Sequence, residues 1–245
     1  KYYDLLYMDK DYKKECDFME KIFEKYLDSK PKKILDLGCG TGGHLTILAQ
    51  RGYEITGIDA SKSMIEIARN KVQKMNLDVK LYNFDIRNFC LNEKFDAVIC
   101  MFAVIDYLTK NEDLQKAFLN IRRHLKKGGL FIFDFWYGPA VLTIKPSVRI
   151  KVVKKNDLKI IRMVTPKLNS LKHTLTSHYH LIALKGDRII DEIKESHVIR
   201  FLFPQEIRHY LEENNFELLE ISEFLKLNKP PTEETWNAMA IAKAI

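Results

Sequence analysis

Three carboxylates stand at the ends of successive apolar runs in the first half of this 245-residue chain: Asp36, Asp59 and Asp85. Carboxylate oxygens accept hydrogen bonds from polar groups of a ligand and stabilise a nearby positive charge. When such runs are strands of a parallel sheet, their carboxyl ends meet in one crevice. We therefore expect the three side chains to belong to a single binding site.

A glycine-rich segment, residues 34–45 (ILDLGCGTGGHL), links the first apolar run to the start of a helix. Glycines at such a turn adopt positive φ and let the backbone approach a ligand closely. The spacing G-x-G-x-x-G from Gly38 matches a dinucleotide fingerprint, and Asp59 follows at the distance suited to a ribose. However, Asp36 disfavours a pyrophosphate against the same loop and favours a ligand that carries a positive charge.

The pattern formed by Asp36, Gly38, Gly40 and Gly42 resembles motif I of the class I S-adenosylmethionine-dependent methyltransferases. The resemblance implies that Asp59 bonds both ribose hydroxyls and that the acidic residue after the third strand reaches the adenine amino group. An N-terminal aromatic residue covers the cofactor in related enzymes. The resemblance assigns to S-adenosylmethionine, or to S-adenosylhomocysteine as product, the residues Tyr3, Asp36, Gly38, Cys39, Gly40, Asp59, Ala60, Met64, Asp85, Ile86 and Met101.

The elements that must position these residues alternate between strands and helices up to residue 136. Short apolar runs predict strands, and 3.6-residue periodicity predicts helices between them. Ser61 is a suitable N-cap for the longest helix of this half. The expected strands are 33–37, 54–58, 79–82, 95–101 and 130–135, and the expected helices are 44–50, 61–75 and 113–125. A helix near residue 9 precedes them, and the alternation predicts a doubly wound, parallel α/β sheet.

The pattern changes after Trp136, where helices give way to β-rich runs separated by turns. These runs are 148–153, 158–164, 173–184 and 188–201. A helix from Pro204 to about residue 214 and strands at 216–221 and 236–245 follow. We predict a Rossmann-like, seven-stranded α/β fold with an inserted antiparallel β meander. Residues 1–138 and 202–245 form the cofactor-binding domain in this prediction, and residues 139–201 form a substrate-binding insertion.

Positive charge is concentrated in the inserted segment. The chain has 40 Lys and Arg against 33 Asp and Glu, and residues 145–200 alone contain 13 basic and 5 acidic residues. Such a segment either meets an anionic partner or is a solvated sheet whose lysines discourage edge-to-edge pairing. Arginine suits bidentate contact with phosphate, and Arg149, Arg162 and Arg200 are the candidates.

The end of the fifth strand and the late elements suggest a subgroup. Residues 134–139 (DFWYGP), Glu195-x-His197 and residues 203–207 (FPQEI) resemble the N-methyltransferases that dimethylate a nucleotide-linked amino sugar. The resemblance implies a small-molecule acceptor, and histidine titrates near physiological pH. The predicted substrate-binding residues are Asp106, Trp136, Tyr137, Arg149 and Arg200, and the predicted catalytic residues are His178, His197 and Tyr107.

Alternatives remain at this stage. An RNA methyltransferase agrees with the net charge of +7, but the Asn-Pro-Pro-Tyr-like motif of base chemistry is missing after Met101. A non-catalytic S-adenosylmethionine-binding module and a dehydrogenase are the others. Four scattered cysteines and the lack of ligand spacing predict reduced thiols and no metal site. We expect a cytoplasmic protein with no signal peptide and no membrane span, and the inserted sheet allows a homodimer.

Overall fold

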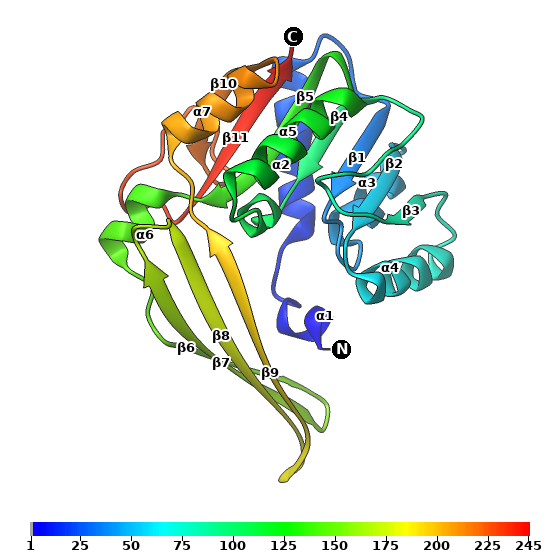
Figure 1. The fold of residues 1–245 in the computed structure, drawn as a ribbon. Helices are drawn as coiled ribbons and strands as arrows, with labels where there is room; N and C mark the ends of the chain where they lie inside the picture. The colour runs from blue at the N-terminus through cyan, green and yellow to red at the C-terminus, as the bar shows by residue number, and fades with distance from the viewer. Residues whose placement is uncertain (1) are drawn as a thin grey trace.

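The computed structural model describes residues 2–245, which form two β-sheets and the helices around them (Figure 1). The larger sheet has seven strands in the order β10-β11-β5-β4-β1-β2-β3. Its strands are β1 Lys33–Leu37, β2 Glu54–Asp59, β3 Lys80–Asn83, β4 Phe95–Cys100, β5 Leu125–Trp136, β10 Phe216–Glu223 and β11 Asn237–Ala244. Only β11 runs against its neighbours, so the sheet is the doubly wound α/β sheet that the sequence predicts.

Helices cover both faces of this sheet. The helices are α1 Tyr3–Leu6, α2 Tyr12–Tyr26, α3 Gly43–Gln50, α4 Lys62–Lys74, α5 Asn111–His124, α6 Gly138–Ile144 and α7 Pro204–Glu213, with a 3₁₀ turn η1 at Val104–Tyr107. Side chains alternate between the faces of a strand. Thus Phe131 and Phe133 pack with α5 and α7, whereas Leu130 and Ile132 pack with α2, α3 and α4. Two apolar cores hold the sheet between these layers.

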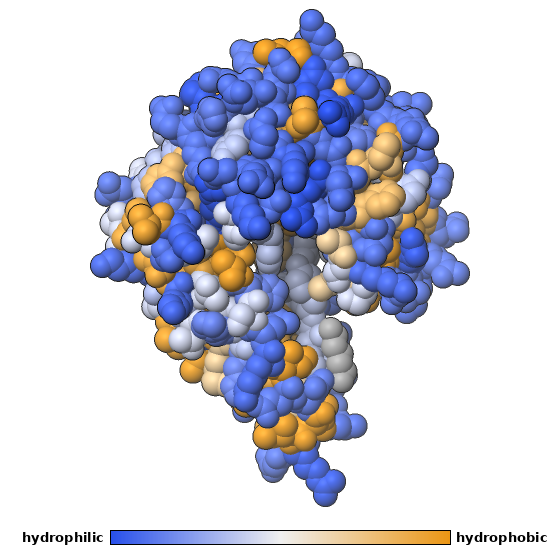
Figure 2. Space-filling model, viewed as in Figure 1, coloured by the Kyte–Doolittle hydropathy of each residue, from blue (hydrophilic) through white to orange (hydrophobic). Residues whose placement is uncertain are grey.

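The inserted segment forms a separate four-stranded antiparallel sheet in the order β6-β7-β8-β9. Its strands are β6 Arg149–Lys155, β7 Leu158–Asn169, β8 Thr174–Lys185 and β9 Arg188–Arg200. Figure 1 shows this sheet projecting from the main body as an arm, with α1 beside it. A small apolar cluster joins Leu6 of α1 to Ile160 and Leu181 of the arm. Figure 2 shows a hollow between the main body and the arm.

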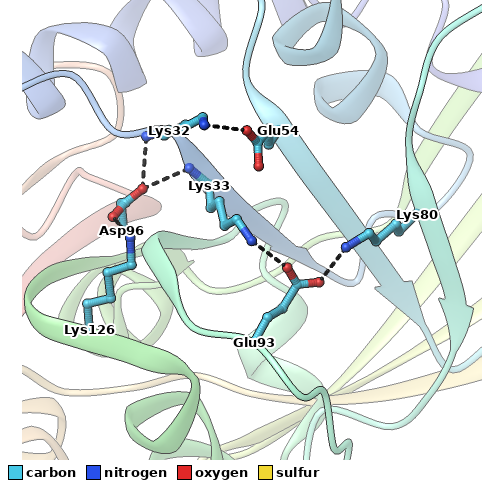
Figure 3. Close-up of polar contacts among 7 residues, drawn as sticks. All are labelled: Lys32, Lys33, Glu54, Lys80, Glu93, Asp96 and Lys126. Carbon is cyan, nitrogen blue, oxygen red and sulfur yellow. Dashed lines mark hydrogen bonds and ion pairs between the residues drawn. The ribbon is translucent and has the colours of Figure 1, made fainter.

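The amino-terminal edge of the larger sheet is closed by ion pairs (Figure 3). Glu93 bridges Lys33 and Lys80 at 3.0 Å from each ammonium group. Asp96 accepts two backbone N–H bonds and pairs with Lys126 at 2.6 Å. The carboxylates at this edge are therefore occupied by the chain itself, in contrast to Asp36 at the opposite edge.

Most differences from the prediction concern short elements and boundaries. Helices α1 and α6 and the turn η1 were not expected, because four to seven residues carry too little periodicity. Strand β5 begins at Leu125 rather than at residue 130, since Gly128 and Gly129 lie within the strand. The Ser61 N-cap is confirmed, because its hydroxyl accepts the Met64 N–H. Pro204 begins α7 as predicted.

Candidate functional site

The loop between β1 and α3 is fastened to the end of β2. The Gly38 and Cys39 N–H groups donate to the Ile58 carbonyl at 2.8 and 3.0 Å. The Asp59 carboxylate then spans two segments, because Oδ2 accepts the Gly40 N–H at 2.9 Å and Oδ1 accepts the Ser61 N–H at 2.7 Å. Asp59 therefore fixes the shape of the glycine loop as well as facing the space above it.

Gly38 and Gly40 of the loop require glycine for different steric reasons. Gly38 has a φ of +68°, and a Cβ there would lie 2.5 Å from a methyl group of Val104. Gly40 has a φ of +54°, but a Cβ there would meet no atom within 4 Å. Gly38 thus permits close packing against η1, whereas Gly40 borders open space that a ligand can enter.

Asp36 lies beneath the loop and is almost completely buried. Burial, and then the neighbouring Asp59 carboxylate, raise the pKa of Asp36 to about 8. Its Oδ2 atom is buried and has no hydrogen-bond partner among residues 2–245. A positive charge close to this carboxyl would therefore be favoured, since it would stabilise the ionised form.

A single cavity of about 620 Å³ lies above the carboxyl edge of the larger sheet and continues to the arm. It is lined by ten of the eleven residues that the sequence assigned to a cofactor; Asp36 is the exception, because it lies under the loop. The ten are Tyr3, Gly38, Cys39, Gly40, Asp59, Ala60, Met64, Asp85, Ile86 and Met101.

Asp85 faces the cavity from the segment after β3. The Arg87 guanidinium donates to both of its oxygens, at 2.9 and 2.6 Å, and Arg87 also pairs with Asp113 at 3.3 Å. The hydrogen bonds from Arg87 lower the pKa of Asp85 despite its partial burial. Asp85 is therefore an ionised acceptor at neutral pH and is suited to a neutral donor such as an amino group.

Helix α1 and the residue after it form one wall of the cavity through Tyr3, Leu6 and Tyr7. Its Asp4 accepts the Thr41 hydroxyl at 2.6 Å, which ties α1 to the glycine loop. The Tyr7 ring lies edge-on to Phe102, with 5.1 Å between centroids. The N-terminal aromatic residues thus close the side of the cavity nearest the loop.

The end of the cavity at the arm carries a chain of polar groups. The Tyr107 hydroxyl lies 2.9 Å from His197 Nδ1, and His197 Nε2 lies 3.4 Å from a Glu195 oxygen. Burial, followed by Tyr179, Tyr7 and Glu195, raises the pKa of Tyr107 well above its usual range. Tyr107 therefore stays protonated and can donate to Nδ1, and Nε2 then faces Glu195 as a donor.

Comparisons with known proteins identify the family. Residues 34–129 match a family described as a methyltransferase domain. The chain is 30% identical over 206 residues to a dTDP-3-amino-3,6-dideoxy-alpha-D-glucopyranose N,N-dimethyltransferase of Streptomyces fradiae, covering 83% of this chain and 77% of the relative. The chain belongs to the S-adenosylmethionine-dependent methyltransferases.

Solved structures share the fold of this methyltransferase. An S-adenosylmethionine-dependent methyltransferase of Clostridium acetobutylicum superposes with a TM-score of 0.86 at 24% identity, covering 99% of this chain and 96% of that one. An amino pentose methyltransferase of Micromonospora echinaspora, solved with S-adenosylmethionine bound, gives 0.81 at 20% identity and covers 100% and 97%. The arm and the larger sheet therefore recur together in this fold.

The site of the methyltransferase fits S-adenosylmethionine. The open space above Gly40, the acceptor atoms of Asp59 and Asp85, and the unpartnered buried oxygen of Asp36 match a ligand with hydroxyl, amino and cationic groups. Met64 and Ile86 provide apolar walls between those acceptors. Asp59 and Asp85 would hold the adenosine portion, and the glycine loop would pass beneath the rest.

The structure separates the predicted catalytic residues. Tyr107 and His197 line the cavity, but His178 does not. His178 lies on β8 between Ser177 and Tyr179, which both face the cavity, so its side chain points to the other face of the arm. There its Nδ1 atom lies 2.8 Å from the Ser196 hydroxyl. The prediction for His178 overlooked this strand alternation, and we retain only the other two.

Among the predicted substrate-binding residues, Trp136 alone lines the cavity. Asp106 is fully buried and accepts the Trp136 N–H at 2.8 Å, so it supports the end of β5 from below. Tyr137 pairs with Leu202 through a backbone bridge that joins β5 to the chain leaving the arm. Neither Asp106 nor Tyr137 lines the cavity, in contrast to the prediction from the sequence.

Two predicted arginines have other partners. Arg149 lies over the Trp236 ring, with 5.6 Å from its guanidinium carbon to the ring centroid. Arg200 is buried and forms an ion pair with Glu206 of α7. Neither lines the cavity, whereas Arg162, the third arginine considered from the sequence, does. Any arginine can bind phosphate, but only an arginine whose side chain points into the cavity can bind a phosphate there.

A buried pair beside the cavity was missed by the sequence analysis. His44 Nε2 lies 2.6 Å from a Glu15 oxygen, and Lys10 pairs with the same carboxylate. Burial opposes ionisation of Glu15, but the bonds to His44 and Lys10 lower its pKa overall. Tyr12 lies edge-on to His44, with 4.9 Å between centroids. These contacts join α2 to α3, and sequence spacing gives no signal for a pair 29 residues apart.

Among residues 2–245, no helix has the length and apolar character needed to cross a membrane. The same residues contain no cluster of three or more His, Cys, Asp or Glu side chains that could hold a metal ion.

Proposed function

We propose that this methyltransferase transfers a methyl group to the amino group of a sugar carried by a nucleotide diphosphate. The observation that carries the proposal is the single cavity that runs from Asp59 to the Tyr107–His197 pair. The relative from Streptomyces fradiae is named for N,N-dimethylation of a dTDP-linked amino sugar, and the likeness extends over 83% of this chain. The basic arm gives such an acceptor a surface of opposite charge.

The protein contributes to methyl transfer by positioning the two reactants and by excluding water from the cavity. S-adenosylmethionine supplies, when bound, an electrophilic methyl group on a sulfonium that is a good leaving group. Asp59 and Asp85 fix one end of the cavity, and α1 covers it through Tyr3 and Tyr7. Holding a nucleophile in line and about 3 Å from its target provides much of the rate enhancement of such a displacement.

The Tyr107–His197–Glu195 chain can prepare the amine. An amino sugar is partly protonated at neutral pH, and only the free amine has the lone pair that attacks. The ammonium proton passes to Tyr107 Oη while the Tyr107 proton passes to His197 Nδ1, so Tyr107 remains neutral. The imidazolium that results lies 3.4 Å from the Glu195 carboxylate, which stabilises it.

Methyl transfer from isotopically labelled S-adenosylmethionine tests the proposal. The acceptors would be a dTDP-linked 3-amino sugar, its 3-hydroxyl counterpart, a simple amine and bulk RNA. We expect label on the amino sugar and none on the hydroxyl counterpart. Label on RNA alone would overturn the sugar acceptor, and label on the hydroxyl counterpart would overturn N-methylation.

A further inference from the structure

Arg162 is the cationic residue of the arm that reaches into the cavity. It lies in β7 opposite Leu181 of β8, and both side chains line the cavity. Its Nη1 donates to the Tyr7 hydroxyl at 3.0 Å. The guanidinium carbon lies 5.5 Å from the centroid of the Tyr7 ring and 6.0 Å from that of Tyr179. Two aromatic rings therefore hold the guanidinium in a fixed place.

Arg162 differs from the other arginine of the cavity in its carboxylate partners. Arg87, which also lines the cavity, is paired with both Asp85 and Asp113. Arg162, in contrast, forms no ion pair within residues 2–245, and its buried Nε has no hydrogen-bond partner there. The bond from Lys151 and, to a smaller extent, the charge of Arg162 lower the pKa of Asp9, but the Asp9 carboxylate forms its ion pair with Lys151, at 2.8 Å.

An arginine in this state is suited to an anionic ligand. A guanidinium has five N–H donors, and a buried donor without an acceptor is costly. Arg162 uses one of its donors on Tyr7 and leaves the buried Nε without an acceptor. A phosphate group can accept two parallel bonds from the planar fork, which a neutral hydroxyl cannot do.

The distance along the arm fits a sugar phosphate. Arg162 of β7 lies opposite Leu181 of β8. The next residue on the same face of β8 is Tyr179, which lies opposite Glu195 of β9. His197 is the following residue on that face of β9, so it is two same-face positions along the arm from Arg162. The Tyr179 ring joins the two ends of this stretch, because its centroid is 6.0 Å from the Arg162 guanidinium carbon and 5.1 Å from the His197 ring centroid. This spacing accommodates one sugar ring between an amine near Tyr107 and a phosphate near Arg162.

We propose that Arg162 binds a phosphate group of the acceptor and so selects a phosphate-linked sugar over the free sugar. The inference rests on the proposed function, because it assigns a residue to the nucleotide diphosphate of that acceptor. It replaces Arg149 and Arg200, whose side chains are directed elsewhere.

The test compares three variants. Arg162→Gln removes the charge, and Tyr7→Phe removes the bond between Tyr7 and Arg162 but leaves the guanidinium in place. Arg188→Gln removes an exposed arginine at the tip of the arm and serves as a matched control. Each variant would be titrated calorimetrically with dTDP and with S-adenosylhomocysteine. Initial rates would be measured with a dTDP-linked 3-amino sugar and with the methyl glycoside of the same amino sugar.

We expect Arg162→Gln to weaken dTDP binding and to raise KM for the dTDP-linked sugar, each by roughly 10-fold or more. Arg162→Gln and Tyr7→Phe lose the same bond between Tyr7 and Arg162, so their affinities for S-adenosylhomocysteine and their rates with the methyl glycoside should match each other. Arg162→Gln should lose at least about 10-fold more dTDP affinity than Tyr7→Phe, and Arg188→Gln should keep its affinity for dTDP. If Arg162→Gln binds dTDP as wild type does, the assignment is wrong. It is also wrong if Tyr7→Phe loses as much dTDP affinity, since Arg162 would then act by anchoring α1.

The outcomes separate this inference from the proposed function. If wild type methylates no amino sugar yet binds dTDP through Arg162, the proposed function fails and the phosphate site stands. If wild type methylates amino sugars but binds neither dTDP nor inorganic pyrophosphate, the phosphate site is overturned and N-methylation stands. Failure of both activities would overturn both.

Discussion

At the scale of single residues, Asp36 couples the site to pH. Its folded-state pKa of about 8 lies above the ordinary value of 3.8. The protonated form is therefore favoured by folding, so this contribution to stability is fully present below pH 3.8 and is lost as pH rises through about 8. Asn is isosteric and cannot ionise, so Asp36→Asn removes the dependence.

We expect the difference in unfolding free energy between Asp36→Asn and wild type to move in favour of the variant as pH rises from 4 to 8. Denaturant titrations at each pH, without ligand, measure it. Asp78→Asn changes an exposed loop carboxylate and is the control. A difference that stays flat across this range would mean that Asp36 is ionised in the folded protein.

Asp59 acts on the cofactor both directly and through the loop. Replacing it with Ala leaves the Gly40 and Ser61 N–H groups without their acceptor and removes the acceptor for a ribose. The loss of a buried acceptor costs about 1–3 kcal/mol, which corresponds to roughly 5- to 150-fold in affinity for S-adenosylhomocysteine. Calorimetric titration of Asp59→Ala beside Asp78→Ala measures this loss. Equal affinities for the two variants would contradict the role.

Substitution of His197 or Tyr107 should lower the rate of methyl transfer, whereas substitution of a histidine on the opposite face of the arm should not. Loss of a general base typically lowers kcat by about 10²- to 10⁴-fold, and we expect the kcat of His197→Gln to fall by up to this amount. Tyr107→Phe removes the hydroxyl that relays the proton but keeps the base, so its kcat should fall less. His180 pairs with Glu192 on the opposite face, so His180→Gln is the control. The rate of His197→Gln should also recover at high pH, where the amine is already free. A pH–rate profile equal to that of wild type would remove His197 from the mechanism.

At the scale of elements, the glycine loop predicts two separable phenotypes. Gly38→Ala forces a side chain to positive φ and against Val104, so it should destabilise the fold by about 2–4 kcal/mol. Adding Val104→Ala removes the clash and should restore all but about 1–2 kcal/mol of strain. Gly40→Ala meets no atom and bears only the strain of positive φ, about 1–2 kcal/mol, so it should cost less stability than Gly38→Ala and should also lower cofactor affinity.

Urea unfolding and calorimetry of Gly38→Ala, Val104→Ala, the double variant Gly38→Ala/Val104→Ala and Gly40→Ala distinguish these effects. Steric relief by Val104→Ala would appear as a non-additive coupling energy, because the two residues are in contact. If the double variant is no more stable than Gly38→Ala, the close packing of the loop on η1 is not what requires a glycine.

Local pattern was sufficient for the elements that are long and strongly periodic. The strand 33–37 and the Ser61 cap agree with the structure, because a buried apolar run and a polar cap depend on neighbours in sequence. The turn η1 follows instead from tertiary packing, with Phe102 and Ala103 held at positive φ. The carboxylate of Asp134 accepts the Ala103 N–H at 3.0 Å, a contact that no local pattern contains.

The site divides in the same way. Residues at strand ends, such as Asp59 and Asp85, could be placed from topology alone, since all parallel strands end at one edge. Residues of the arm could not, because a shift of one position on a strand turns a side chain to the other face. His178 and Arg149 were assigned to the site for their chemistry but do not line the cavity. Of the three arginines that the sequence offered as phosphate contacts, Arg162 is the one that lines it.

At the scale of the whole molecule, α1 connects the two sheets around the cavity. Asp4 bonds Thr41 of the glycine loop and lies 3.4 Å from Lys71 of α4. On the other side, the Tyr7 hydroxyl bonds Arg162 and the Asp9 carboxylate bonds Lys151 of the arm. An isolated four-residue helix has no stability of its own, so α1 depends on these contacts.

Cofactor binding should therefore order α1. A ligand that touches Tyr3 and Leu6 adds contacts to a segment of low intrinsic stability, and such segments respond most strongly in hydrogen exchange. We expect S-adenosylhomocysteine to slow amide exchange in residues 3–7 by about 10-fold or more, while α5, whose buried face packs on the far side of the sheet, changes little. Hydrogen exchange read by mass spectrometry, with Asp4→Asn as a comparison, measures this response. Equal exchange in α1 with and without ligand, under saturation shown by calorimetry, would mean that α1 is a fixed wall and takes no part in closing the site.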